Sequence, residues 1–358
     1  MSRKDEYVLI TGGAGFIGSH LVEQLVKNGN DVTVVDNLST GKIENLQNVI
    51  DKIEFIHLSV TNYIETVGPL FDFDQVYHLA ASVGVKNILE SPLECINNNI
   101  DDTRLLFREI SNQIDSHLIK NNPRIFIAST SEVYGKNNKQ QLSETDDRIT
   151  GPTDIVRWVY AATKAMDEFV ANIYIQKFNM DIVIGRFFNI TGPRQSSAYG
   201  MVLPTFIEQA MKEEDITVYG DGEQIRSFMY IEDCLEVIDA LMNGTKYCGV
   251  VNIGNPKSIM ISDLAWRVRQ LCNSNSKIVY KTYAEAYGCG FEDMIRRVPS
   301  IAKLYDIVGW DIGGMFRNIN EIIELTKDYN KTKLENEPTI EELEEDLNDE
   351  IKSLSEKD

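Results

Sequence analysis

The amino-acid sequence predicts an α/β fold in which a doubly wound parallel sheet carries a smaller mixed α/β lobe. Three features of the chain indicate this fold class. Short apolar runs, each the length of a buried strand, alternate with helix-length segments through the first half. A glycine-rich turn joins the first apolar run to the first helical segment. From about residue 189 the alternation gives way to loops, short helices and a few strands, punctuated by Gly and Pro.

Six segments are expected to form the parallel strands, because each is short, apolar and bounded by turn residues. They are residues 7–11, 31–36, 53–58, 75–81, 124–130 and 181–187. Parallel neighbours need crossover connections, and the intervals between these segments are long enough for helices. The carboxyl ends of such strands lie along one edge of the sheet, where ligands bind in this fold class.

The composition limits the classes of partner. A formal net charge of −20 over 358 residues opposes binding to nucleic acid or to an anionic membrane surface. The five cysteines contain no CxxC pair, so neither a disulfide framework nor a zinc site is expected, and no metal is predicted. No apolar run reaches ~18 residues, and a short charged leader runs directly into the first strand. We therefore expect a soluble, cytoplasmic protein with reduced thiols.

The glycine-rich turn, TGGAGFIGSH, places Gly12, Gly15 and Gly18 at GxxGxxG spacing. Glycines allow the tight turn, the approach of the backbone to a pyrophosphate and the close packing of helix on strand, while the helix N-terminus faces the phosphates. Asp36 ends the second strand, where a carboxylate binds the hydroxyls of an adenosine ribose. It would repel a 2′-phosphate, and no arginine follows in DNLSTGK, so NAD is favoured over NADP.

Tyr160 and Lys164, in RWVYAATK, have YxxxK spacing, which puts both side chains on one face of a helix. With an ordinary pKa near 10, a tyrosine is only ~0.1% ionised at neutral pH, so it needs a nearby cation to act as a base. Lys164 and a positively charged nicotinamide ring are the expected cations. Alternatively, the two residues could be an incidental pair on an amphipathic helix. The glycine turn, and STSEVYG at the end of the fifth strand, argue against this alternative.

Seven segments together resemble the extended short-chain dehydrogenase/reductase family, the NAD-dependent epimerases, dehydratases and decarboxylases of nucleotide sugars. The resemblance runs from about residue 6 to 328 and rests on TGGAGFIGSH, DNLSTG, YHLAA, STSEVYG, YAATK, RFFNITGPR and TVYGDGEQIRSF. It implies a Rossmann-type sheet, NAD as cofactor, a UDP-sugar substrate and a homodimer. One departure is Ser59, which stands where the family commonly has an aspartate that meets the adenine.

The resemblance also assigns roles to residues. The catalytic group would be Thr130, Ser131, Glu132, Tyr160, Lys164 and Arg297. The cofactor would be bound by Gly12, Gly15, Phe16, Ile17, Gly18, Asp36, Asn37, Ser39, Thr40, Gly41, Leu79, Ala80, Ala81, Asn99, Tyr160 and Lys164. The UDP-sugar would be bound by Val85, Lys86, Asn189, Val202, Leu203, Tyr219, Arg226 and Arg297.

Glu132 discriminates among the reactions of the family. A 4,6-dehydratase uses an Asp-Glu pair to expel a hydroxyl, and Ser131, at the Asp position, is a poor general acid. Simple 4-epimerases usually have a small neutral residue where this chain has Glu132. UDP-xylose synthases, and the decarboxylase domain of the aminoarabinose lipid A pathway, resemble this chain in having a Ser-Glu pair. The Ser-Glu pair therefore favours a decarboxylase.

Two further segments resemble the lipid A decarboxylase group. YGCGFEDMIRRVPSI matches a segment that contributes a catalytic arginine, here Arg297, and GPTDIVRWVYAATK matches through Arg157 and Trp158. By contrast, AASVGVKNILESP is more similar to uronate 4-epimerases. The sequence thus favours NAD-dependent decarboxylation of UDP-glucuronate to UDP-xylose through a 4-keto intermediate. A UDP-hexose or UDP-hexuronate 4-epimerase is the main alternative, followed by a 4,6-dehydratase and a non-catalytic NAD-binding regulator.

In the decarboxylase interpretation, Glu132 lies beside the sugar C5. Burial and the neighbouring substrate carboxylate are expected to raise the pKa of Glu132, so that it, or a water held by it and Ser131, protonates C5 after carbon dioxide leaves. Arg297 would orient the departing carboxylate. The structural alternatives are that Glu132 braces the loop and that Arg297 binds phosphate alone.

Three regions are expected along the chain. Residues 1–188, with about 227–255, form the NAD-binding Rossmann domain, residues 189–226 and 256–330 form the nucleotide-sugar-binding lobe, and residues 331–358 form an acidic tail. The homodimer is expected to pair the helix after Asn99 with the helix containing Tyr160, where FVANIYI offers apolar surface.

Overall fold

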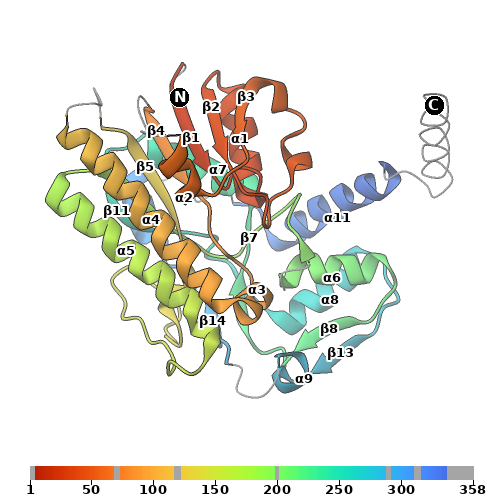
Figure 1. Ribbon diagram of the computed structural model, residues 1–358. Helices are drawn as coiled ribbons and strands as arrows, with labels where there is room; N and C mark the ends of the chain where they lie inside the picture. The colour runs from red at the N-terminus through yellow and green to blue at the C-terminus, as the bar shows by residue number, and fades with distance from the viewer. Residues whose placement is uncertain are drawn as a thin grey trace, which may run out of the picture.

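The computed structural model describes residues 5–67, 73–116, 122–197, 201–287, 292–309 and 316–336. At its centre lies a seven-stranded parallel sheet with the order β11-β6-β5-β4-β1-β2-β3 (Figure 1). The strands are β1 (Tyr7–Thr11), β2 (Asp31–Val35), β3 (Ile53–Ile56), β4 (Gln75–His78), β5 (Arg124–Thr130), β6 (Asp181–Phe187) and β11 (Gly249–Ile253). All six predicted strands are present, and the predicted doubly wound, Rossmann-type fold is confirmed.

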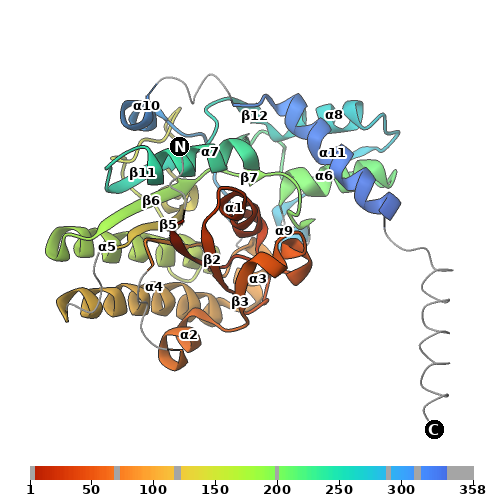
Figure 2. The ribbon, with the colours of Figure 1, turned by 90° about the horizontal axis from the view of Figure 1, so that it is seen from above.

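Helices cover both faces of this sheet, as Figure 2 shows from above. They are α1 (Phe16–Lys27), α2 (Val60–Thr66), α4 (Pro92–Asp115), α5 (Val159–Phe178), α7 (Ile231–Asn243) and α10 (Ala302–Val308). Alternate residues of β1 point to opposite faces, so Val8 and Ile10 join the core under α1 and α7, while Leu9 joins the core under α2, α4 and α5. Burial on both faces explains why the predicted strands are apolar throughout.

The smaller lobe contains short strands and helices that follow the change of rhythm near residue 189. Its strands are β7 (Ile190–Thr191), β8 (Ile216–Tyr219), β9 (Ile225–Ser227), β10 (Met229–Tyr230), β12 (Ser258–Met260), β13 (Ile278–Lys281) and β14 (Arg296–Arg297). Its helices are α6 (Val202–Met211), α8 (Ile261–Leu271), α9 (Tyr283–Tyr287) and α11 (Ile319–Asn336), and α3 (Val85–Glu90) lies nearby (Figure 1). Short 3-10 helices are η1 (Ile43–Leu46), η2 (Ile50–Lys52), η3 (Ser131–Tyr134) and η4 (Val156–Trp158).

The two lobes share one continuous hydrophobic core. A single cluster of buried side chains joins Val8 of β1 to Phe206 of α6 and Leu264 of α8. Helix α11 continues to Asn336, past the expected start of the acidic tail at residue 331. Residues 337–358 of that tail lie outside the described residues.

The carboxyl ends of the parallel strands converge on the smaller lobe. β1 leads into the Gly12 turn, β2 into Asp36, and β5 into the loop that carries Glu132. Across from them, β14 pairs in parallel with β9, and this register sets Arg297 beside Arg226. Residues far apart in the sequence therefore meet along one edge of the sheet.

Candidate active site

A large cavity of about 1960 Å³ lies between the carboxyl edge of the sheet and the smaller lobe. Most of the predicted site residues border it. They are Gly12, Gly15, Phe16, Ile17, Gly18, Asp36, Asn37, Ser39, Thr40, Gly41, Leu79, Ala80, Ala81, Thr130, Ser131, Glu132, Tyr160, Lys164, Asn189, Val202, Tyr219, Arg226 and Arg297. Residues of both lobes therefore form one cleft.

Four predicted site residues are not in this set. Asn99 is buried behind the cavity wall, where its Oδ1 accepts a hydrogen bond from Ser82 N (2.8 Å) and its Nδ2 donates to Thr163 Oγ1 (3.1 Å). It braces a cavity loop against α5 instead of bordering the cavity. Leu203 is buried in the hydrophobic core, whereas Val202, the first residue of α6, borders the cavity. The side chains of Val85 and Lys86 lie outside the described part of the chain.

The glycine turn has the shape of a dinucleotide cradle. Gly12 has a φ of +72°, and a Cβ there would lie 2.7 Å from Ala80 N. A Cβ on Gly18 would lie 2.2 Å from Gly12 O, which shows how closely α1 packs on the turn. Side chains at either position would block this packing. The N-terminus of α1 thus faces the cavity with backbone amides suited to a pyrophosphate.

Asp36 is buried at the end of β2. Its Oδ2 accepts a hydrogen bond from Ala14 N (2.9 Å) and its Oδ1 from Leu38 N (2.8 Å). Burial raises the pKa of Asp36, and the two amides partly offset that rise. The carboxylate is thereby fixed between the glycine turn and the next loop, where it has lone pairs left for ribose hydroxyls. Ser59, the departure noted in the sequence, caps α2 by accepting a hydrogen bond from Asn62 N (3.1 Å).

Tyr160 and Lys164 both lie on α5 and border the cavity, as their spacing predicts. Burial raises the pKa of Tyr160 above its ordinary value, the Glu132 charge raises it further, and a hydrogen bond with Thr130 lowers it. Tyr160 therefore needs positive charge to act as a base. Lys164 Nζ lies 2.8 Å from Asp167 Oδ2, so its ammonium already has a buried counter-ion.

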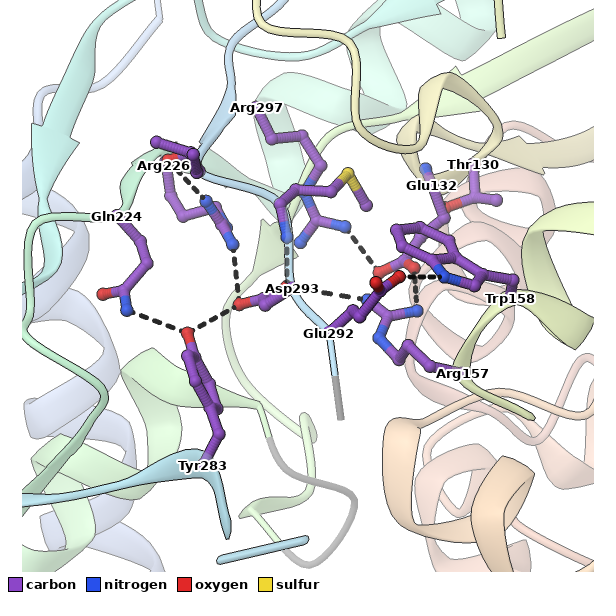
Figure 3. Close-up of polar contacts among 12 residues, drawn as sticks. Thr130, Glu132, Arg157, Trp158, Gln224, Arg226, Tyr283, Glu292, Asp293 and Arg297 are labelled. Carbon is purple, nitrogen blue, oxygen red and sulfur yellow. Dashed lines mark hydrogen bonds and ion pairs between the residues drawn. The ribbon is translucent and has the colours of Figure 1, made fainter. Parts of the chain in front are cut away.

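Glu132 lies between two arginines, as Figure 3 shows. Arg157 Nη1 donates to its Oε2, and Arg297 Nη1 donates to its Oε1 at 2.6 Å. Arg297 also donates to Asn189 Oδ1 (2.7 Å), and its buried Nε has no hydrogen-bond partner among the described residues. An orphaned guanidinium donor beside a cavity is suited to an anionic ligand.

The charge state of Glu132 differs from the sequence-based expectation. Burial by itself would raise the pKa of Glu132, but Arg157 and Arg297 overcome burial and lower it to about 2. The expectation of a raised pKa was wrong because it left out Arg157, whose contact with Glu132 depends on the fold. Glu132 is a carboxylate near neutral pH.

A second acidic residue, Asp293, connects the groups on the opposite side of the cleft (Figure 3). Its Oδ2 accepts hydrogen bonds from Arg226 Nη2 (3.0 Å) and Tyr283 OH (3.1 Å), and its Oδ1 lies 3.9 Å from Arg157 Nη2. The neighbouring Glu292 accepts a hydrogen bond from Trp158 Nε1 (2.8 Å). These two acids fasten the segment that carries Arg297 to the start of α5.

Sequence reasoning left the roles of Arg157, Glu292 and Asp293 unassigned. A usable signal was present, because all three lie in the two segments that resemble the lipid A decarboxylase group. An acidic pair just before Arg297, and an arginine just before Tyr160, have complementary charges. Pairing them required knowledge that the two segments face each other across the cleft.

The chain belongs to the NAD dependent epimerase/dehydratase family, which it matches over residues 8–254. It is 38% identical over 312 residues to a UDP-N-acetyl-alpha-D-glucosaminuronate decarboxylase of Bacillus cytotoxicus, a match that covers 85% of this chain and 94% of the relative. It is 34% identical to the UDP-glucuronic acid decarboxylase 1 of Xenopus tropicalis, over 93% of this chain and 72% of the relative. The predicted family is confirmed.

Solved structures of related enzymes have the same fold. A UDP-N-acetylglucosamine 4-epimerase from Methanobrevibacter ruminantium M1 superimposes with a TM-score of 0.79 at 31% identity, covering 92% of this chain and 100% of that one. A UDP-glucuronic acid 4-epimerase from Bacillus cereus, solved with NAD, gives 0.77 at 27% identity, covering 91% and 99%. This chain is an NAD-dependent enzyme, and NAD as its cofactor is confirmed.

Among the described residues, no three His, Cys, Asp or Glu side chains are grouped so as to hold a metal ion. Within the same residues, every helix is too short or too polar to cross a membrane.

Proposed function

We propose that the protein decarboxylates UDP-glucuronate to UDP-xylose through a 4-keto intermediate. The observation that carries this proposal is the Arg157–Glu132–Arg297 group at the end of β5, close to Tyr160. Arg297 keeps a donor, Nε, that Glu132 and Asn189 do not use, and a substrate carboxylate could accept from it where a neutral hexose would not. Relatives named as uronate decarboxylases at 38% and 34% identity support the same activity.

The first step is oxidation at the sugar C4. Bound NAD would supply the hydride acceptor for C4 and the donor for the later reduction. Tyr160 removes the proton from O4, while the Thr130 hydroxyl holds that oxygen in place. The hydrogen bond between Thr130 and Tyr160 already joins the two groups. Lys164, four residues along α5, supplies the positive charge that lets the tyrosine act as a base.

The second step is loss of carbon dioxide. A C4 ketone makes the sugar a β-keto acid, which loses its carboxyl group and leaves an enolate at C5. Glu132 is ionised, so it repels the substrate carboxylate at close range, and departure of carbon dioxide relieves that repulsion. Arg297 holds the departing carboxylate and stabilises the enolate oxygen. A water held by Ser131 and Glu132 then delivers the proton to C5.

The other reactions of the family fit these residues less well. Dehydration needs an acid at the position of Ser131, and a hydroxyl is a poor one. Epimerisation at C4 gives no catalytic role to Glu132, which is ion-paired with Arg157 and Arg297. A non-catalytic regulator would not need Tyr160 and Lys164 side by side on the cavity wall.

A second candidate substrate is the 2-acetamido counterpart, UDP-N-acetylglucosaminuronate. The relative at 38% identity, covered over 94% of its length, is named for decarboxylation of this sugar. The reaction at C4 to C6 is the same, so the residues around Glu132 suit both. Selectivity would depend on the space beside the sugar C2.

Mass spectrometry tests both substrates directly. The protein is incubated with NAD and either UDP-glucuronate or UDP-N-acetylglucosaminuronate. Loss of the mass of carbon dioxide is expected with UDP-glucuronate, and loss only with the acetamido sugar would select the second candidate. A product of unchanged mass would indicate an epimerase, and loss of water a dehydratase. Either of those results contradicts decarboxylation.

We also propose that the enzyme is a homodimer formed through α4 and α5. Leu93 on α4, and Met166, Phe169 and Ile173 on α5, are exposed apolar side chains on these neighbouring helices. Such a surface is typical of helix pairing between subunits. Sedimentation at micromolar concentration should give twice the chain mass, and Phe169→Glu should give the monomer. A wild-type monomer would contradict the proposal.

We further propose the three-region division of the chain and a cytoplasmic location. The parallel sheet and the smaller lobe support the first two regions, and α11 extends past residue 331, where the tail was expected to begin. Free thiols at Cys95, Cys234, Cys248 and Cys272 are usual in a reducing compartment.

A further inference from the structure

Asp167 is a buried acid in direct contact with Lys164. It lies three residues later in α5, and its Oδ2 is 2.8 Å from Lys164 Nζ. Only 1% of Asp167 and 2% of Lys164 is exposed to solvent. Lys164 borders the cavity whereas Asp167 does not, so the acid contacts the lysine from behind. Neither the family resemblance nor the proposed reaction gives Asp167 a task.

The surroundings of Asp167 determine how costly its negative charge is. Its carboxylate contacts Lys164 Nζ through Oδ2 and is also hydrogen-bonded by the Thr103 hydroxyl of α4. A buried carboxylate is costly, and a fold retains one where it performs a function or a partner compensates it. Burial raises the pKa of Asp167, and the Lys164 ammonium and the Thr103 hydrogen bond counteract this rise.

Other titratable groups lie near this pair on the adjoining elements of the described chain, two of them neutral and three of them acids held by other residues. They are His78 on β4, Cys95 and Asp102 on α4, Glu132 on η3 and Glu168 on α5. Burial lowers the pKa of His78 to about 3 and raises that of Cys95, so both are uncharged near neutral pH. The three acids accept hydrogen bonds or ion pairs from Thr61, from Arg157 and Arg297, and from Arg186, respectively.

We propose that Asp167 is a positioning residue that holds the Lys164 ammonium and offsets part of its charge, thereby setting the pH range in which Tyr160 works. An anion close to the lysine weakens the positive field that the tyrosine experiences. In agreement, the Asp167 charge is one of the influences that raise the pKa of Tyr160, after burial, Glu132 and Cys95. This inference rests on the proposed roles of Tyr160 and Lys164 as base and cation.

The test is Asp167→Asn, which keeps the shape and removes the charge. The ultraviolet absorbance of tyrosinate is titrated with NAD bound and without substrate, and subtraction of the same variant carrying Tyr160→Phe isolates Tyr160 from the other tyrosines. Tyr160 is expected to ionise at a pH lower by about one unit. The acid limb of kcat/KM, which reports the base of the free enzyme, should move in the same direction. Asp167→Glu restores the charge and should restore the wild-type titration.

Asp181→Asn is the matched control. It removes an acid from the 2.5 Å pair with Arg124 at the other end of the sheet, so it should alter stability without moving the Tyr160 titration. An unchanged titration in Asp167→Asn would overturn the proposal and leave Asp167 as a brace of α5. A shift to higher pH would also overturn it, because Lys164 would then have lost its charge with its partner. Asp167→Ser provides the same test if the Asn variant does not fold.

The titration also separates this inference from the proposed function. It needs neither UDP-glucuronate nor turnover, so failure to release carbon dioxide leaves its result intact. Conversely, a decarboxylase with an unmoved Tyr160 titration would refute only the role of Asp167.

Discussion

Glu132, which is mostly buried, and Asp167, which is fully buried, are two acids near the same tyrosine, and the structure shifts their pKa values in opposite directions. Burial alone would raise the pKa of each acid. Glu132 has two arginines, from separate segments of the chain, and its pKa falls to about 2. Asp167 has one lysine, from its own helix, and its pKa stays above the ordinary value. The number of cations in contact, and not burial alone, decides the direction in which the pKa of such an acid moves.

The difference assigns the two acids to different tasks. Glu132 borders the cavity with a firmly held negative charge, which suits contact with substrate. Asp167 lies behind Lys164 and acts on Tyr160 through that lysine. Variants that change one region and leave the other intact test this division.

The largest effect is expected from Tyr160→Phe, which removes the group that both acids influence. Turnover should fall by roughly 10²-fold or more, the usual scale for a positioned base, while NAD remains bound because the glycine turn is untouched. Steady-state rates and NAD titration measure the two effects. Tyr7→Phe makes the same change at a residue that is 55% exposed and should match the wild type. A rate above about a tenth of the wild type would contradict Tyr160 as the base.

The next largest effect is expected from Glu132→Gln, which is nearly isosteric. Release of carbon dioxide from UDP-glucuronate should slow by roughly 10²-fold, because the variant loses both the repulsion of the substrate carboxylate and a group that holds the proton-donating water. Binding of UDP-glucuronate should persist, since Arg157 and Arg297 remain. Glu236→Gln, on the exposed side of α7, is the control. Wild-type release by Glu132→Gln would make Glu132 a brace of its loop.

A smaller effect is expected on stability in acid. The pKa of Glu132 is lowered from 4.5 to about 2, so its stabilising effect is complete above about pH 4.5 and is lost as the pH falls toward 2. At pH 6, Glu132→Gln should reduce the free energy of unfolding by about 3 kcal/mol. Urea unfolding at a series of pH values should show the wild type and the variant converging in acid. A constant difference would indicate that Arg157 and Arg297 do not hold the carboxylate.

Local sequence was sufficient for the frame of the molecule. The apolar runs predicted six strands of the central sheet, and the glycine spacing predicted the turn in which Gly12 and Gly18 have no room for a Cβ. The spacing of Tyr160 and Lys164 placed both on one helix face at the cavity. These features depend on short-range rules, namely strand and helix periodicity and the conformational freedom of glycine.

The sequence by itself thus determined the fold class, the cofactor cradle and the tyrosine–lysine pair. Only the tertiary structure decided the charge of Glu132, because that charge depends on Arg157 of η4 and Arg297 of β14, which the fold brings to it from distant segments. It also turned Asn99 and Leu203 away from the cavity, because neighbouring residues of a helix face different sides. The physical reason is the distance along the chain over which each property is determined. Helix and strand periodicity depends on residues close in sequence. The electrostatic potential at a buried group depends on all the charges that the fold places near it.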